Sequence, residues 1–294
     1  MTAMMKIGMV GLGRMGAGLA GRLRAAGHEV IGYDRNPDIS DVASIKAMVT
    51  QLPSPRVVWI MVPSGAITQD TIEAVAKELA PGDIVIDGGN SYVKDTVRRG
   101  KELAKRGIRF LDVGTSGGIW GLENGFCLMA GGERDVFEHV EPALAALASE
   151  GGYGHVGACG AGHFSKMVHN GIEYGMLQAY AEGFDLLHCA TEYDYDLHQL
   201  AALWNHSSVV RSWLLELAEN AFASDPNLDK LKAYVDDSGE GRWTVLEAVE
   251  RGVNVGVLAQ ALFARFTSRE ENAFSMRVIA ALRNEFGGHA VRTA

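Results

Sequence analysis

The feature that most constrains this chain is a glycine-rich turn close to its start. A short apolar run at residues 6–10 leads directly into this turn, and residues 15–26 then have helical spacing. In such a strand–turn–helix unit, the glycines permit the tight turn, the close approach of backbone to a pyrophosphate, and the packing of helix on strand. The helix N-terminus then faces the anion. The pattern predicts dinucleotide contacts from Gly11, Leu12, Gly13, Arg14, Met15 and Gly16.

The end of the second predicted strand indicates which dinucleotide binds. Residues 28–33 form this strand, and Asp34 follows it, 18 residues after Gly16. An acidic residue there hydrogen-bonds the ribose hydroxyls and repels a 2′-phosphate, which favours NAD over NADP. Arg35 is able to bind a 2′-phosphate, so NADP stays open as the less favoured cofactor. Val62 and Pro63, at the end of the third predicted strand, are further candidates for cofactor contact.

The order of elements predicts an α/β fold followed by helices. Short β-branched or apolar runs alternate with helical stretches, which is typical of a doubly wound parallel sheet. We therefore predict a Rossmann-type domain over residues 1–160 and an all-α domain for substrate binding and dimerisation over 161–294. The predicted strands are 6–10, 28–33, 57–62, 84–87 and 109–113, and the helices between them include 15–26, 68–79 and 91–106.

Charge and cysteine content exclude several classes of protein. The 27 Lys and Arg against 36 Asp and Glu give a formal net charge of −9, which disfavours nucleic-acid binding. The start of the chain has neither a signal peptide nor 18 consecutive apolar residues, so no membrane association is expected. Cys127, Cys159 and Cys189 lie far apart without a CxxC pair. This spacing predicts reduced thiols, no metal site and a cytoplasmic location.

Two glycine-containing loops follow predicted strands in the middle of the chain. Asp87-Gly88-Gly89-Asn90-Ser91 ends one strand, and Thr115-Ser116-Gly117-Gly118 follows the next. Ligands bind at the carboxyl ends of strands in an open parallel sheet. We therefore take Asn90, Ser116, Gly117 and Gly118 as candidate ligand contacts, although each loop alone is equally consistent with a simple turn.

A narrow row of polar residues marks the start of the helical domain. Lys166, His169, Asn170, Glu173 and Tyr174 occupy positions i, i+3, i+4, i+7 and i+8, which is one face of a helix, and apolar residues cover most of the rest. The pattern predicts a buried helix whose polar row faces a cleft, with a solvated face as the alternative. A desolvated lysine has a lowered pKa, which suits a general base.

The C-terminal segment supplies candidate anion ligands. Residues 241–294 hold seven arginines, no lysine and five acids. The planar guanidinium suits bidentate recognition of phosphate or carboxylate. We expect two or three of these arginines to serve a ligand and the others to lie on the surface.

These strings together resemble the decarboxylating 6-phosphogluconate dehydrogenases along nearly the whole chain. The matching strings are GLGRMG at 11–16, DGGNS at 87–91, SGG at 116–118, GHFSKMVHNGIEYG at 162–175, RWT at 242–244, ALFARFTS at 261–268 and RNEFGGHA at 283–290. Because the chain is shorter than the common long members, it is similar to the short, NAD-preferring branch.

The resemblance implies a reaction and a set of roles. The reaction is the oxidative decarboxylation of 6-phosphogluconate to ribulose 5-phosphate and CO2 with reduction of NAD, a step of the pentose phosphate pathway. Lys166 would be the base and then the acid, and Glu173 the second acid/base group. The implied sugar-acid contacts are Asn90, Ser116, Gly117, Gly118, His169 and Asn170. The implied contacts at the phosphate or carboxylate end are Tyr174, Arg242, Thr244, Arg265, Arg283 and His289.

The resemblance also implies an oligomer. At two positions this sequence differs from the long members of the family. In the family the arginine and histidine of the tail come from a neighbouring subunit, which implies a homodimer or homotetramer. Long members usually carry Lys where Arg242 stands, and Glu where Ile119 stands. Arg242 keeps the charge with another geometry, whereas Ile119 removes one polar contact.

Two other functions remain open from the sequence. Another β-hydroxyacid dehydrogenase, of the 3-hydroxyisobutyrate or tartronate-semialdehyde type, would share the dinucleotide-binding domain, the SGG loop and a lysine followed four residues later by an asparagine. A non-catalytic dinucleotide sensor would keep the glycine-rich turn. It would have no reason to keep Lys166 and Glu173 on one helical face.

Overall fold

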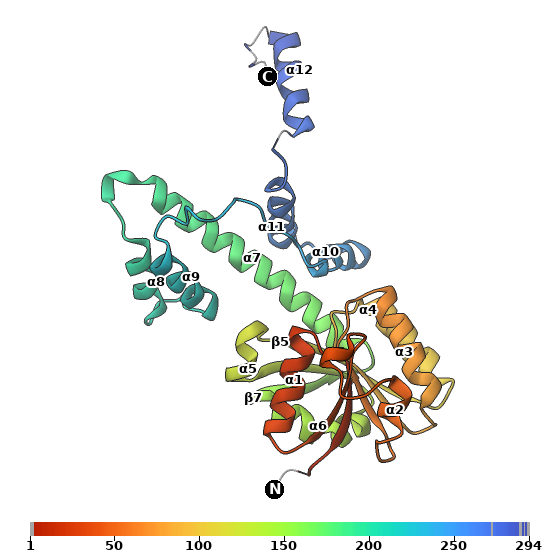
Figure 1. The fold of residues 1–294 in the computed structure, drawn as a ribbon. Coiled ribbons are helices and arrows are strands. Elements are labelled where there is room, and N and C mark those ends of the chain that lie inside the picture. Colours follow the sequence, from red (N-terminus) through yellow and green to blue (C-terminus); the bar gives the residue numbers. More distant parts are fainter. Residues whose placement is uncertain (1–2, 272, 288–289, 291, 293–294) are drawn as a thin grey trace. The chain divides into compact units, whose positions relative to one another are not determined.

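The computed structural model describes residues 3–271, 273–287, 290 and 292. The chain divides into two units, residues 1–169 and residues 170–294, called here the first and second unit. Figure 1 shows the strands of the first unit and the helices of the second. Each unit is described by itself.

The first unit is built on one seven-stranded sheet with the order β2-β1-β3-β4-β5-β6-β7. The order reverses at β1, whose neighbours are β2 and β3, so a crevice opens at the carboxyl ends of β1 and β3. The strands are β1 (Lys6–Val10), β2 (Glu29–Tyr33), β3 (Val57–Ile60), β4 (Ile84–Asp87), β5 (Arg109–Ser116), β6 (Phe126–Gly132) and β7 (Ala148–Gly157).

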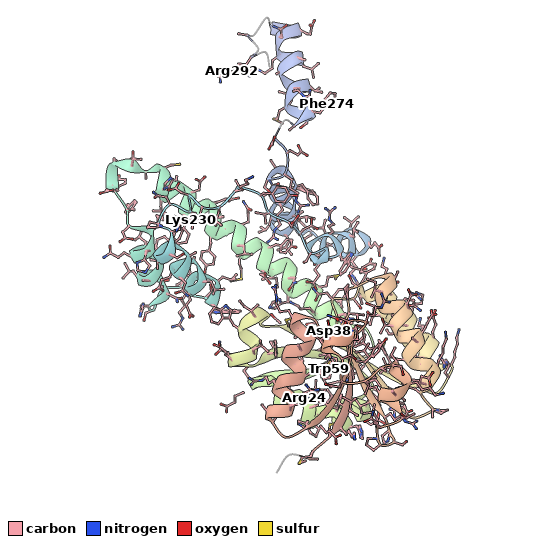
Figure 2. All side chains as sticks on the ribbon, in the orientation of Figure 1. Arg24, Asp38, Trp59, Lys230, Phe274 and Arg292 are labelled. Atoms are coloured by element: carbon pink, nitrogen blue, oxygen red, sulfur yellow. The ribbon has the colours of Figure 1, made fainter. Side chains whose placement is uncertain are left out.

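Helices cover both faces of this sheet (Figure 1). One core layer packs α1 (Arg14–Ala25) and α6 (Arg134–Leu147) against strand residues such as Trp59, which is fully buried (Figure 2). The other packs α2 (Ile45–Val49), α3 (Ala66–Glu78) and α4 (Val93–Ala104). Because both faces are covered, the inner strands are mostly apolar, and Asp87 of β4 and Asp112 of β5 are buried exceptions.

The α/β class with a following helical domain is confirmed, and one pair of strands departs from the parallel arrangement. The sheet is mostly rather than fully parallel, because β6 runs antiparallel to β5. Only residues 117–125 separate these strands, and they hold a 3-10 turn (Gly118–Trp120) and the short helix α5 (Gly121–Asn124). A parallel return needs a crossover of about a dozen residues or more, so the chain turns back directly.

The last two strands were not expected from the sequence. Strands β6 and β7 lie past the last predicted strand, and β7 contains Gly151, Gly152, Gly154 and Gly157. Glycine is depleted in strands, so this segment gave no strand signal. The first five predicted strands differ from the observed ones by at most three residues at either end.

Helix α7 (Ala161–Cys189) begins in the first unit and continues into the second. The second unit also contains a 3-10 turn (Thr191–Tyr193), α8 (Leu197–Asn205), α9 (Trp213–Ser224), α10 (Glu240–Arg251), α11 (Gly256–Thr267) and α12 (Phe274–Gly287). Its larger core cluster joins Phe184 of α7 to Ala201, Leu215 and Phe222 of α8 and α9. The two units divide inside α7, whereas the predicted domain boundary at residue 160 precedes this helix.

The start of α7 lies directly on β5 and β6. A Cβ added to Gly162 would overlap the carbonyl oxygen of Met129 and would lie 2.6 Å from the carbonyl oxygen of Asp112. A Cβ added to Gly114 would overlap the Cβ of Lys166. The absence of side chains at these two glycines therefore fixes how closely α7 approaches the sheet.

This close approach predicts the effect of adding one methyl group. Gly162→Ala places a Cβ against backbone oxygens that cannot move independently, so we expect it to destabilise the protein by about 1–3 kcal/mol or more. The measurement is thermal or urea-induced unfolding. Gly154→Ala is the matched control, because a Cβ there has no neighbour within 4 Å. Equal stability of the two variants would contradict the packing described here.

Candidate active site

The glycine-rich turn leaves the first amides of α1 without a side-chain cap. Gly13 is the N-cap residue and provides no side-chain hydrogen bond. Gly11 has a φ of 91°, which favours glycine, and a Cβ on Gly16 would overlap the carbonyl oxygen of Gly11. An uncapped helix N-terminus beside a tight backbone turn is a binding site for a phosphate group.

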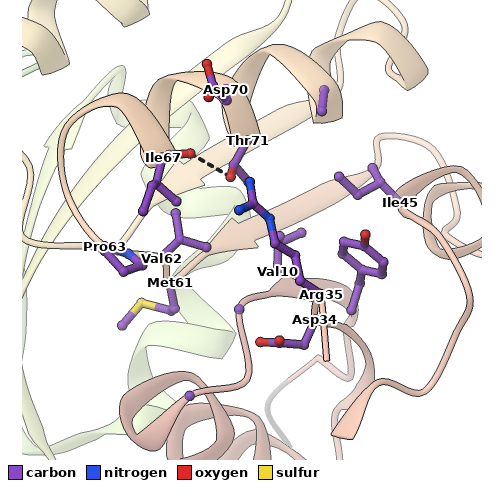
Figure 3. A pocket seen from close by; sticks show the side chains of 14 residues that line it. Val10, Asp34, Arg35, Ile45, Met61, Val62, Pro63, Ile67, Asp70 and Thr71 are labelled. Carbon is purple, nitrogen blue, oxygen red and sulfur yellow. Dashed lines mark hydrogen bonds between the residues drawn. The ribbon is translucent and has the colours of Figure 1, made fainter. Parts of the chain in front are cut away.

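A cavity of about 480 Å³ lies beside this turn, at the point where the strand order reverses. Val10, Gly11 and Gly13 line it from one side, and Val62 and Pro63 line it from the end of β3. Arg35 extends into the cavity toward Thr71 of α3 (Figure 3). The structure thus brings most of the predicted cofactor residues together around one cavity.

Asp34 is held in place at the mouth of this cavity. One carboxylate oxygen accepts a hydrogen bond from the backbone N–H of Leu12 at 2.7 Å, and the other accepts from the N–H of Asn36 at 2.9 Å. The carboxylate therefore sits next to the glycine-rich turn with its orientation fixed (Figure 3). A fixed carboxylate at this position accepts bonds from ribose hydroxyls and repels a 2′-phosphate.

This arrangement predicts how the cofactor preference responds to a change of charge. Asp34→Asn keeps an acceptor for Leu12 and removes the negative charge, while Arg35 stays in the cavity. We expect the ratio of kcat/KM for NAD to that for NADP to fall at least tenfold, which corresponds to about 1.4 kcal/mol. Asp38→Asn makes the same change on the exposed neighbouring turn and should leave the ratio unaltered. Equal losses with both cofactors would refute the role given to Asp34.

Further predicted site residues of the first unit lie at and just after the carboxyl ends of β4 and β5. Asp87 ends β4, and the loop that follows carries Asn90. Ser116 ends β5, and its hydroxyl lies 3.4 Å from Nε2 of His169 on α7. The hydroxyl of Thr115 is buried and has no hydrogen-bond partner among the described residues.

Lys166 lies on the first turns of α7 and is 8% exposed. The base of its side chain lies against Gly114 of β5, two residues before Ser116. The first unit therefore places Lys166, His169 and Ser116 at the carboxyl end of β5. A nearly buried lysine beside two hydrogen-bonding side chains is suited to proton transfer.

The start of α7 is fixed by a carboxylate that the sequence analysis did not single out. Asp112 of β5 is fully buried, and its two oxygens accept hydrogen bonds from the N–H groups of Gly160 and His163, at 2.6 and 2.8 Å. Burial raises the pKa of Asp112 above its usual value. His163 in turn lies 2.8 Å from the hydroxyl of Thr96 through Nδ1. An acidic residue near the end of a predicted strand was the only available signal.

The second unit carries the next part of the polar row. The side-chain amide of Asn170 donates to the carboxylate of Glu240, which is 2% exposed. Thr244 packs on Gly171 and donates its hydroxyl to the carbonyl of Glu240. Glu173 is half-buried on the same helix. Asn170 and Thr244 thus lie close together around Glu240, which the sequence analysis also missed.

Tyr174 and two of the predicted arginines also meet in the second unit. The guanidinium carbon of Arg265 lies 3.5 Å from the centre of the Tyr174 ring. Arg242 bonds Asp237 through two nitrogens, at 2.7 and 3.1 Å. Arg269 shares that carboxylate at 2.8 Å, and the arginines lower the pKa of Asp237 to about 2. Arg242, Arg265 and Arg269, with Asp237 between two of them, are called here the basic cluster.

Two residues that were predicted to bind the phosphate or carboxylate end, Arg283 and His289, are not seen in the basic cluster. Arg283 is exposed on α12, and among the described residues it is not hydrogen-bonded to Tyr174, Arg242 or Arg265. His289 lies outside the described residues. Phe274, at the start of α12, is 71% exposed (Figure 2).

The predicted burial of α7 holds for only part of the helix. Met167 is 2% exposed, as expected, but Ile172 is 51% exposed, and Met176 and Leu177 are also exposed. The polar row is the better-buried side in this stretch, because Asn170 and Tyr174 pack against α10 and its preceding loop. Within the described residues of one chain, these apolar side chains remain accessible to solvent.

The described residues contain no helix that is long and apolar enough to cross a membrane. They also contain no group of three or more His, Cys, Asp or Glu side chains placed to hold a metal ion.

The fold and the glycine-rich turn define a dinucleotide-binding protein with an added helical domain, and family comparisons narrow this class. Residues 6–160 match the NAD binding domain of 6-phosphogluconate dehydrogenase. Residues 162–288 match the 6-phosphogluconate dehydrogenase C-terminal domain. The chain therefore belongs to the 6-phosphogluconate dehydrogenase family.

Individual relatives agree with this assignment. The NAD(+)-dependent, decarboxylating 6-phosphogluconate dehydrogenase of Haloferax volcanii is 41% identical, with 98% of both chains covered. The NADP(+)-dependent, decarboxylating enzyme of Bacillus subtilis is 36% identical, but this chain spans only 61% of it. The structure of Plasmodium falciparum 6-phosphogluconate dehydrogenase has a TM-score of 0.83 at 26% identity, covering 98% of this chain and 66% of that one. Mycobacterium tuberculosis 3-hydroxyisobutyrate dehydrogenase, at 24% identity and a TM-score of 0.72, shares the fold.

Proposed function

We propose that this protein catalyses the oxidative decarboxylation of 6-phosphogluconate with NAD as the preferred oxidant. The observation that carries the proposal is the position of Lys166, nearly buried at the carboxyl end of β5 beside Ser116 and His169. The dinucleotide cavity with its fixed Asp34 belongs to the same unit. A base at this edge of a dinucleotide-binding sheet fits the removal of a hydroxyl proton during hydride transfer.

The proposed reaction runs through two proton-transfer groups. Bound NAD supplies the acceptor for the hydride that leaves C3 of the substrate. Neutral Lys166 accepts the proton of the C3 hydroxyl, giving a 3-keto acid and the lysine ammonium. The ammonium then donates to the ketone oxygen while the C1–C2 bond breaks, so that CO2 leaves and an enediol forms. Glu173 protonates the former C2 of the substrate, which becomes C1 of ribulose 5-phosphate. Each positioned acid or base contributes about 10²–10⁴-fold.

The remaining predicted residues are assigned to substrate binding. Hydrogen-bonding groups of two loops and of α7 would contact the sugar acid, and the basic cluster of the second unit would contact its phosphate. The planar guanidinium of Arg242 suits phosphate recognition, and Asp237 fixes its orientation by accepting from Nε and Nη2. The proposed sugar-acid contacts are Asn90, Ser116, Gly117, Gly118, His169 and Asn170, and the proposed phosphate-end contacts are Tyr174, Arg242, Thr244, Arg265, Arg283 and His289.

We further propose a homodimer or homotetramer in the cytoplasm. Exposed apolar side chains on α7, α10 and α11, such as Ile172, Val249 and Val257, support subunit association. The cytoplasmic location rests on the three isolated cysteines, none of which forms a disulfide. For the domains, we keep residues 1–160 as the dinucleotide-binding part and 161–294 as the part for substrate binding and dimerisation.

A comparison of substrates tests the proposed function. The purified protein is assayed for NADH formation with 6-phosphogluconate, 3-hydroxyisobutyrate and glycerate, and then with NAD against NADP on the best substrate. We expect kcat/KM for 6-phosphogluconate to exceed that for the unphosphorylated acids by several orders of magnitude, with NAD preferred. Preference for an unphosphorylated acid would establish the β-hydroxyacid alternative, and turnover of none of them would favour the dinucleotide sensor.

Substitution of Lys166 tests the proposed chemistry separately from binding. Lys166→Met removes the proton-transfer group and keeps a side chain of similar length, so turnover should be abolished while NAD binding is retained. Steady-state rates and cofactor titration by fluorescence measure the two effects. Lys105→Met, at the exposed end of α4, is the control and should keep full activity. Near-normal turnover by the Lys166 variant would overturn its assignment.

A further inference from the structure

Arg99 of α4 is an almost fully buried cation in the first unit, with 1% of its surface exposed. Its guanidinium donates Nε to the side chain of Gln69 at 3.0 Å and Nη2 to the carbonyl of Gly65 at 3.0 Å. Nη1 donates to the hydroxyl of Ser91 at 3.1 Å and lies 3.5 Å from the carboxylate of Asp87. All three guanidinium nitrogens are therefore engaged, on two separate segments of the chain.

Both of these segments carry proposed ligand contacts. Gly65 and Gln69 belong to the turn and first helical residues after Val62 and Pro63, which line the dinucleotide cavity. Asp87 and Ser91 enclose the loop of residues 88–90, whose last member is Asn90. One guanidinium thus joins the loop after β3 to the loop after β4.

Neutralising Asp87 does not by itself account for this arrangement. Asp87 already accepts the Ser91 hydroxyl at 2.7 Å and the backbone N–H of Gly89 at 3.2 Å. The Arg99–Asp87 distance of 3.5 Å is the longest of the four Arg99 contacts, whereas the bonds to Gly65 and Gln69 reach groups that carry no charge. A buried guanidinium is costly unless its donors are satisfied, so its shape and contacts constrain both loops.

We propose that Arg99 is a positioning residue that fixes the loop at residues 62–65 relative to the loop at 88–90, and so aligns the cofactor with the substrate carbon that loses hydride. The inference rests on the proposed function. A misplacement of about 1 Å between reacting groups costs up to about 10²-fold in rate. A lysine at this position keeps the charge but cannot span the four partners, because its three N–H donors share one nitrogen.

The neighbouring Arg98 offers a matched control. It lies on the same helix and also donates to Gln69, at 3.1 Å, but it is exposed and its other bonds go to Asp95 and Glu102 on α4 itself. Arg98→Lys and Arg99→Lys therefore make the same chemical change one residue apart. Ser91→Ala is a milder second variant, which removes the hydroxyl between Arg99 and Asp87.

The test compares these three variants with the wild type. It measures kcat per folded molecule, the KM for NAD and for 6-phosphogluconate, the deuterium isotope effect with 6-phosphogluconate labelled at C3, and NADH affinity by fluorescence. For Arg99→Lys we expect kcat to fall at least tenfold, the isotope effect to rise and NADH to bind about fivefold more weakly. Ser91→Ala should lower kcat about threefold or more and raise the isotope effect. Arg98→Lys should stay within twofold of wild type in every measure.

Other outcomes separate the inference from the proposed function. A folded Arg99→Lys protein with wild-type kcat, isotope effect and NADH affinity, reduced only in thermal stability, would overturn the inference and leave a structural role. If Arg99→Lys does not fold, an unchanged kcat and isotope effect in Ser91→Ala would overturn it. A wild-type protein that does not oxidise 6-phosphogluconate would refute the proposed function, and the NADH affinities of the two lysine variants would still decide whether Arg99 positions the cofactor loop.

Discussion

The proposed active site depends most on the hydrogen bonds that the buried carboxylate of Asp112 accepts. It accepts hydrogen bonds from the N–H groups of Gly160 and His163, and so fixes the start of α7 on β5. A helix N-terminus attracts negative charge, which offsets part of the cost of burying the carboxylate. Because Lys166 lies one turn further along α7, its position relative to β5 follows from this bond pair and from the close contact at Gly162. Fixing one helix end thus determines where the proposed base lies.

The chain uses buried or shared charges at several points where ligand residues must be held. Asp34 accepts two backbone N–H groups beside the glycine-rich turn, Arg99 joins two loops, and Asp237 joins Arg242 to Arg269. The hydrogen bonds cited for each of these charged groups lie within one unit. Near Tyr174, the carboxylate of Asp237 thus holds Arg242 and Arg269 together in a protein whose net charge is −9.

Local patterns were sufficient for the first five strands and for the polar row of α7. The glycine-rich turn, the apolar runs and the i, i+3, i+4 spacing each depend on a few neighbouring residues. The antiparallel β6 and the glycine-containing β7 were not predictable in this way. The direction of β6 follows from the shortness of residues 117–125, and four of the ten residues of β7 are glycines, which are depleted in strands. Arg99, Asp112, Glu240 and Asp237 were missed for a related reason. Their roles come from contacts with partners 8 to 70 residues away, and no local pattern marks such a contact.

In the proposed reaction, one protein both oxidises its substrate and releases its C1 carbon. The most direct measurement supplies 6-phosphogluconate labelled with ¹³C at C1, together with NAD, and follows NADH and ¹³CO2 in the same reaction. We expect one ¹³CO2 for each NADH and unlabelled ribulose 5-phosphate as the product. NADH formation with the label retained in an organic acid, or no NADH formation at all, would contradict the proposed reaction.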